Sequence, residues 1–230
     1  MKKKMMVAGA LLGSALVLTG CRVDFGNRNQ EVVSYDVAGK LTLLDVRGES
    51  GDVEVNESDR SQVRVTETLH WGGEKGSKDG RPKTEHPVAG GTLTLRYDCS
   101  DCSVDYRIEI PKGLKVTMDV DSGDITLRSL TGEVNATTGS GDIEAGTLGA
   151  KRFVADSGSG TIEAKFAAVP DHVEIETGSG GATVRLPKGG YNVTAETGSG
   201  DRTVKVTHDP SSSSVISART GSGDVNVLPS

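Results

Sequence analysis

The sequence of 230 residues contains few aromatic side chains, with one Trp, four Tyr and three Phe. So few rings disfavour a compact core built around large side chains and favour thin, stacked layers of Val, Ile, Leu and Ala. Proline is also scarce, at 7 residues, and glycine does not recur at every third position, which excludes a collagen-like chain. Glycine itself is abundant, with 31 residues, nearly twice the usual share of about 7%.

Long hydrophobic runs are missing except near the start, where an uncharged, mostly apolar stretch runs from Met5 through Leu18. This stretch is shorter than the roughly 20 residues that a bilayer crossing needs, and three lysines precede it, as in a secretory signal. It ends in Leu-Thr-Gly-Cys21, which resembles the lipobox of bacterial lipoproteins. We therefore expect residues 1–20 to be a lipoprotein signal peptide and residues 21–31 to be a lipidated cysteine and tether. A plain secretory signal with an accidental cysteine is the alternative.

Positive charge is in deficit, with 26 Lys and Arg against 32 Asp and Glu. Removal of the three leader lysines would leave 23 basic residues and a formal net charge of −9. Such a chain has no electrostatic footprint for nucleic acid and is repelled by anionic lipid. Membrane attachment must therefore come from the lipid on Cys21, whose two acyl chains, palmitate for example, anchor stably where one binds marginally. The predicted location is the extracytoplasmic face of the bacterial cell membrane.

Only three cysteines are present, and the two that remain after Cys21 are Cys99 and Cys102. Outside the cytoplasm two nearby thiols are usually oxidised, so we expect a structural disulfide that pins a hairpin. Redox chemistry is the alternative, but it needs cationic neighbours or a helix N-terminus, and here the neighbours are Asp98 and Asp101. A zinc site needs four ligands, which the scattered histidines do not complete. We expect neither a metal nor a cofactor.

A Ser/Thr-Gly phrase, usually followed by Asp and Ile or Val, recurs along the second half of the chain. Its second glycine stands at positions 123, 141, 160, 180, 200 and 223, which are 18 to 23 residues apart, with a lone earlier copy at Gly51. Self-similarity at a period near 20 is typical of a solenoid, and the alternating apolar residues around each phrase indicate short strands. The predicted fold is all-β, a right-handed β-solenoid or β-roll with a repeat of about 20 residues.

We expect residues 32–230 to form a single β-repeat domain. Within it, residues 32–111 form irregular strands with a mobile loop at 72–91, and residues 112–230 form the regular repeats. Arg202 stands where other units carry isoleucine, so either its strand slips or its side chain turns outward. Trp71 and His70, beside the loop, are candidate binding residues, because an exposed Trp can stack on a sugar ring. Capping of a hydrophobic sheet end is the alternative role for Trp71.

The aspartates in the turns suggest calcium binding as a hypothesis. However, the position after the second glycine holds Thr161 in one unit and Gly181 in another. An interrupted row of carboxylates supplies few of the six or more oxygens that calcium takes. Closure of the turns by side-chain to backbone hydrogen bonds is the other explanation. Glu144 and Glu163 alternate with core residues and so face water. Because no catalytic triad, phosphate loop or nucleophile elbow is present, we expect no enzymatic activity, and a glycan-active enzyme is the weakest alternative.

The lipobox, the segment from Cys99 to Pro111 and the repeated Ser-Gly-Asp-Ile strands together resemble a bacterial family of unknown function with β-strand repeats, whose members are regarded as candidate adhesins. The resemblance covers roughly residues 35–228 and implies a β-solenoid on the cell surface, with no catalytic residues. It favours a role in adhesion, binding or surface structure, with a surface protein or glycan as partner. An envelope-stress or sensory accessory lipoprotein that binds a partner protein is the alternative. The chain ends inside its last unit, which predicts weak end-to-end self-association.

Overall fold

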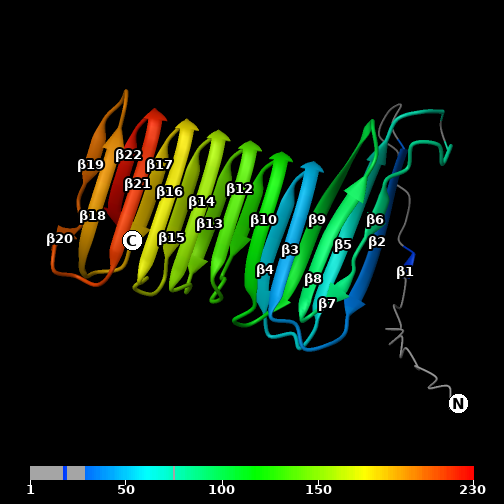
Figure 1. Ribbon diagram of the computed structural model, residues 1–230, viewed down its shortest axis with the longest axis horizontal. Helices are drawn as coiled ribbons and strands as arrows, with labels where there is room; N and C mark the ends of the chain where they lie inside the picture. The colour runs from blue at the N-terminus through cyan, green and yellow to red at the C-terminus, as the bar shows by residue number, and fades with distance from the viewer. Residues whose placement is uncertain (1–17, 20–28, 75) are drawn as a thin grey trace, which may run out of the picture.

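The computed structural model describes residues 18–19, 29–74 and 76–230. It is an all-β structure in which two long, mostly parallel sheets stack on each other around one hydrophobic core (Figure 1). Cys21 and most of the expected signal peptide lie outside the described residues; Leu18–Thr19 forms the short strand β1. In the part of the chain that the structure describes, no helix is long and apolar enough to span a membrane.

The middle of the molecule is a stack of regular coils, each made of a strand, a glycine turn and a second strand. We call the sheet of the second strands sheet A and the sheet of the first strands sheet B. Equivalent residues of neighbouring coils pair in parallel at offsets of 18, 19 and 20 residues, as in Val116↔Val134, Val134↔Phe153 and Phe153↔Val173. The coils are β10 (Lys115–Ser122) with β11 (Ile125–Arg128), β12 (Val134–Ser140) with β13 (Ile143–Leu148), β14 (Arg152–Ser159) with β15 (Ile162–Phe166), and β16 (His172–Ser179) with β17 (Ala182–Leu186).

The last two coils are stacked out of sequence order. The end of the stack is the coil of β18 (Gly190–Thr197) and β19 (Arg202–Val204), with β20 (Thr207–His208) beside β18. The coil that follows it in the chain, β21 (Val215–Ser222) with β22 (Val225–Pro229), inserts between it and β16–β17. The chain therefore ends inside the stack, and the open end expected at the C-terminus is formed by β18 and β19 instead (Figure 1).

Arg202 lies in register opposite Val225, so its strand does not slip. Val225 is buried and Arg202 is exposed, although both occupy inward positions. The difference arises because Arg202 belongs to the terminal coil, where the space between the sheets opens to solvent. Its charged head can therefore reach water while its stem covers the end of the core.

Two further regular coils come from the N-terminal segment that we expected to be irregular. The coil of β3 (Leu43–Ser50) and β4 (Val53–Ser58) pairs in parallel with β10 and β11. The coil of β8 (Thr92–Asp98) and β9 (Cys102–Pro111) pairs in parallel with β3 and β4. This end is closed by antiparallel strands: β5 (Val63–Trp71) and β2 (Asn29–Val37) extend sheet A, and β6 (Lys83–Glu85) and β7 (Val88–Ala89) pair with β8. The segment expected to be a loop over 72–91 thus contains two short strands.

Side chains of the core alternate along every strand, because successive residues of a strand point to opposite faces. Most inward positions of the regular coils hold Val, Ile, Leu or Ala and are fully buried, as at Ile143, Ala145 and Ile175. Phe153 and Phe166 form an edge-to-face pair with ring centroids 5.9 Å apart. Larger rings gather at the N-terminal end, where Tyr35, Trp71, Tyr97 and Tyr106 are buried.

The recurrence of the Ser/Thr-Gly motif in the turns has a steric cause. Gly141 has φ of +145°, and a Cβ atom at this position would lie 2.1 Å from the carbonyl oxygen of Gly123 in the coil below. No side chain fits there. The same carbonyl of Gly123 accepts a hydrogen bond from the Thr138 hydroxyl at 3.1 Å, and Ser157 does the same for Gly141 at 3.0 Å. Glycine and hydroxyl residues therefore recur because each turn stacks directly on the next.

Candidate functional site

The turn aspartates form a ladder along one edge of the stack. An Oδ1 atom of each accepts the backbone N–H of the equivalent residue in the next coil: Asp105 from Asp52 at 3.1 Å, Asp52 from Asp124 at 3.0 Å, and Asp124 from Asp142 at 2.8 Å. Asp142 accepts from Thr161 at 2.7 Å, where the ladder is interrupted, and Asp224 accepts from Asp201 at 2.8 Å in the last two coils. These carboxylates close turns, and among the described residues no group of three or more acidic, His or Cys side chains could hold a metal ion.

Beside this ladder, three hollows adjoin one another on the outer face of sheet A. Their volumes are about 420, 240 and 150 Å³. Neighbouring hollows share lining residues, Thr126 between the first two and Glu144 and Glu163 between the last two. We call this surface the sheet A groove; its outward side chains are Asp52, Glu54, Thr66, Thr68, Asp105, Arg107, Asp124, Thr126, Asp142, Glu144, Thr161, Glu163, Lys165, Thr183 and Arg185.

The groove crosses the strands, because its lining residues come from β5, β9, β4, β11, β13, β15 and β17. One row of outward residues is in register across it, including Arg107, Glu54, Thr126, Glu144 and Glu163. Strands of a sheet lie about 4.8 Å apart. The groove therefore presents a new hydroxyl or charged group at each such step along the stack.

Charged groups in the groove form ion pairs whose side chains stay in contact with water. Arg107 Nε lies 2.9 Å from Glu54 Oε2, and Arg128, at the groove edge, lies 3.8 Å from Glu144. Exposed ion pairs of this kind contribute between 0 and about 1 kcal/mol. Little free energy therefore opposes their rearrangement around a ligand, and carboxylates outnumber basic groups on this surface.

His70 and Trp71 are neighbours in β5 but lie on opposite faces of sheet A. His70 points outward beside the groove, with its side chain 27% exposed and its Nε2 3.0 Å from Asp105 Oδ2. Trp71 points inward, is 2% exposed, and its indole N–H donates to the Ser77 carbonyl at 2.9 Å. The Trp71 ring is thus part of the core rather than an exposed platform for a sugar, because strand alternation turns it inward.

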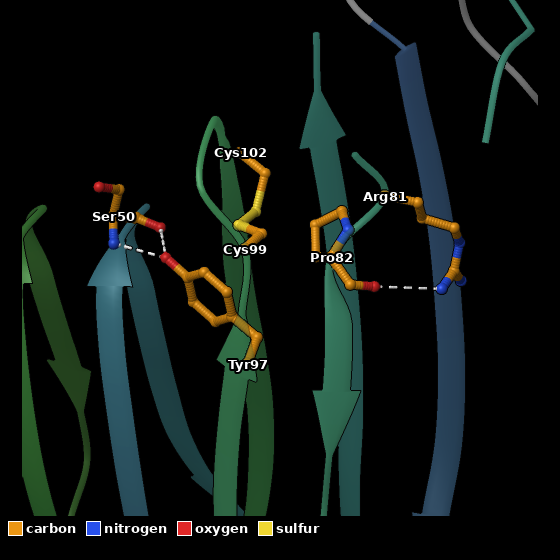
Figure 2. The surroundings of a disulfide bond; sticks show 6 residues. All are labelled: Ser50, Arg81, Pro82, Tyr97, Cys99 and Cys102. Carbon is orange, nitrogen blue, oxygen red and sulfur yellow. Dashed lines mark hydrogen bonds between the residues drawn. A yellow bond between two sulfur atoms is a disulfide. The ribbon is translucent and has the colours of Figure 1, made fainter. Parts of the chain in front are cut away.

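The segment after Trp71 is held against this end of the molecule. The Asn29 side chain donates to the Glu74 carbonyl at 3.2 Å and accepts from the Gly76 N–H at 2.7 Å. Arg81 bonds Glu31 at 2.9 Å and donates to the Pro82 carbonyl at 3.2 Å (Figure 2). The first half of the segment expected to be mobile is therefore tied to β2, between residues 74 and 81.

Cys99 and Cys102 are joined by a disulfide with a Cα–Cα distance of 6.0 Å (Figure 2). The bridge does not pin a hairpin as expected, because β8 lies in sheet B and β9 in sheet A. It closes the turn of one coil, at the place where other coils carry the glycine phrase. Next to it, the Tyr97 hydroxyl donates to the Ser50 carbonyl and accepts from the Ser50 N–H, both at 2.5 Å, which joins two successive coils.

A carboxylate that was not predicted to be buried lies in the core near this end. Glu67 is 1% exposed, and its Oε1 accepts a hydrogen bond from the Tyr35 hydroxyl at 2.6 Å. Burial, and then the nearby Glu67 charge, raise the pKa of Tyr35 and of Tyr106 above the usual range of tyrosine. The signal was present in the sequence, since Glu67 occupies an inward position in the alternation Val63, Val65, Glu67, Leu69.

Comparisons with known proteins found several solved structures of similar length. A candidate cell adhesion protein from Clostridium sporogenes is 15% identical, with 88% of this chain and 100% of that chain covered and a TM-score of 0.50. A candidate adhesin from Bacteroides fragilis is 15% identical over 87% and 97% of the two chains, with a TM-score of 0.35. A candidate lipid binding protein from Parabacteroides distasonis is 12% identical over 89% and 97%, with a TM-score of 0.35.

No curated protein sequence matches the chain significantly. At these identities the likeness to the Clostridium sporogenes protein concerns the fold alone. The family described as Toastrack DUF4097 matches residues 25–228, nearly the whole of the described structure. The chain therefore belongs to the toastrack family DUF4097.

Proposed function

We propose that this protein is a lipid-anchored adhesin on the extracytoplasmic face of the cell membrane, and that it binds an extended surface polymer, protein or glycan, along the sheet A groove. The observation that carries the proposal is the row of three adjoining hollows across successive strands. We also infer a right-handed winding of the coils, the hand that crossovers between parallel strands adopt in nearly all cases.

An extended ligand suits this surface better than a compact one. The strands from β5 to β17 span about 29 Å along the stack at their usual spacing. The three hollows, of about 420, 240 and 150 Å³, follow one another along the order of the strands. A polymer that lies along the stack would meet Thr, Glu, Asp and Arg groups repeatedly, each contributing little by itself and adding up through repetition.

The anchor and the groove have compatible positions. Only seven residues separate Cys21 from Asn29, where β2 begins, and fully extended they span at most about 25 Å. A lipid on Cys21 would hold the β2 end of the stack near the membrane. The strands that line the groove begin next to β2, at β5, and continue away from it to β17 (Figure 1).

The proposal is tested with residues 22–230, purified without lipid and incubated with intact cells and purified wall polymers at moderate salt. We expect saturable binding. The double variant Glu144→Lys/Glu163→Lys reverses the charge of two groove residues that pair in register, and it should weaken binding at least tenfold.

The matched control is Asp156→Lys/Glu176→Lys, which makes the same charge change on two register partners of β14 and β16. Both residues are exposed on the outer face of sheet B, and this variant should bind like the unmodified protein. Equal loss in both variants would show that net charge, rather than the groove, governs binding. Absence of binding to every surface, with one envelope protein recovered by crosslinking, would favour an accessory role instead.

A further inference from the structure

The two ends of the stack differ in how their sheet edges are protected. At the β18–β19 end the edge strands are short, with three residues in β19 and two in β20. Arg202 projects from an inward position, and His208 Nδ1 accepts the Val193 N–H at 3.3 Å. Short strands and charged side chains are the usual means of blocking edge-to-edge association.

The other end carries one long, simple edge. Strand β2 has nine residues, contains neither proline nor lysine, and pairs with β5 at all nine positions without a bulge. On its opposite side, among the described residues, only β1 pairs with β2: its Leu18 and Thr19 lie in antiparallel register with Ser34 and Val33. The middle of the β2 edge therefore accepts an antiparallel strand.

Residues 18–19 belong to the expected signal peptide, so processing before Cys21 would remove them and leave the β2 edge open. We propose that β2 of the mature chain pairs antiparallel with β2 of a second copy, which joins two sheets A into one continuous sheet. This proposal rests on the processing step of the proposed function. It does not depend on the lipid itself or on any ligand.

The side chains of β2 are compatible with such self-pairing. A two-fold axis at Val33 sets Val33 beside the partner's Val33 and Val32 opposite the partner's Ser34, so the centre of the interface is apolar or neutral. Toward the ends, Gln30 faces the partner's Asp36, and Glu31 faces the partner's Tyr35. No like charges stand directly opposite each other, a juxtaposition that would be destabilising. Asp36 is already neutralised within its own chain by Arg60 and Arg64, both at 2.8 Å.

The order of strands also fits. Sheet A is parallel through the coils and becomes antiparallel at β9–β5–β2, so a further antiparallel strand continues the local pattern. The dimer would align two sheet A grooves end to end. Confinement to a membrane raises the effective concentration of the copies, so an interaction that is weak in solution is sufficient for dimerisation there. Two aligned grooves would also bind one polymer with greater avidity than a single groove.

The test is sedimentation equilibrium of residues 22–230 over a wide concentration range. We expect the weight-average mass to rise toward twice the monomer mass. In the variant Val32→Lys/Ser34→Lys, each new lysine would face a lysine of the partner, and the mass should stay at one chain. The control Thr117→Lys/Thr137→Lys adds the same charge to the outer face of sheet B, on β10 and β12, and should dimerise like the unmodified protein.

Hydrogen exchange of the unmodified protein provides a second readout that needs no variant. Protection that increases with concentration at residues 29–37, and not at 202–204, supports the proposal. A monomer at every concentration would overturn it, and so would a dimer unaffected by Val32→Lys/Ser34→Lys or protected at 202–204. Protection of β2 only after an unrelated extended peptide is added would assign the edge to a different occupant. Adhesion is measured separately, so its failure leaves this result intact.

Discussion

At the scale of the residue, the stack depends on positions where one atom decides what fits. Gly141 combines φ of +145° with a carbonyl oxygen 2.1 Å from the site of a Cβ, whereas a Cβ at Gly146 would meet nothing within 4 Å. We expect Gly141→Ala to lower the free energy of unfolding by about 2–5 kcal/mol, the sum of backbone strain and overpacking. Gly146→Ala is the control and should be nearly neutral. Urea denaturation of both variants measures this, and equal effects would contradict the stacking explanation.

The buried tyrosines allow a second comparison at this scale. Tyr35→Phe removes the hydroxyl that donates to the buried Glu67 and should cost about 1–3 kcal/mol, because the carboxylate loses its partner. The Tyr106 hydroxyl is buried without a hydrogen-bond partner, so Tyr106→Phe should be neutral or stabilising. Thermal and urea unfolding at pH 7 distinguish the two. A larger loss for Tyr106→Phe would mean that the polar contacts of Glu67 are assigned incorrectly.

The same residues predict the alkaline limit of stability. Both tyrosines have a pKa raised in the folded state by burial, so the unfolded chain loses these protons first. Their stabilising contribution is complete below about pH 10, where exposed tyrosine ionises, and decreases as the pH rises further. Above pH 10, ionisation of each tyrosine in the unfolded chain should lower the free energy of unfolding by at most about 1.4 kcal/mol per pH unit. Unfolding free energies of Tyr35→Phe/Tyr106→Phe should therefore fall less steeply between pH 10 and 11, and an unchanged slope would contradict their burial.

At the scale of the element, the inserted final coil makes a distinctive prediction. β21 and β22 separate the end coil from β16 and β17, so a chain that stops after Asp209 lacks the strands on which β18 and β19 dock. We expect the amides of residues 190–208 to exchange freely in that truncated chain, while those of β10, β12 and β14 stay protected. Persistent protection of β18 would instead indicate coils stacked in sequence order.

The repeat could be predicted because its cause is local: the glycine, hydroxyl and aspartate of each turn are visible in the sequence. The stacking order of the last two coils could not be predicted from the sequence. Val193 and Ala195 of β18 have the same inward pattern as Ile216 and Ala218 of β21, with which they pair. Either strand could therefore pair with β16. Only the length of the connections and the capping role of Arg202 distinguish the two arrangements. The coil of β8 and β9 was hidden because Cys99 and Cys102 replace its glycine turn. The sheet A groove was mostly missed, since its outward residues follow no common pattern from coil to coil.

At the scale of the whole molecule, the proposed attachment to the membrane rests on Cys21, which lies outside the described residues. The sequence predicts that Cys21→Ser abolishes incorporation of labelled palmitate and releases the protein from the membrane, because a chain of net charge −9 is not attracted to anionic lipid. The control Cys99→Ser/Cys102→Ser removes the other two cysteines and should leave the protein membrane-bound. Retention of Cys21→Ser in the membrane fraction would contradict the anchor.

The central claim is that a polymer binds along the stack rather than at one point. The most direct measurement is the affinity of residues 22–230 for fragments of graded length of whichever surface polymer it captures. We expect the affinity to rise with fragment length and to level off near about 29 Å, the span of the strands from β5 to β17. An affinity already complete with the shortest fragment would place binding at a single site and contradict the groove.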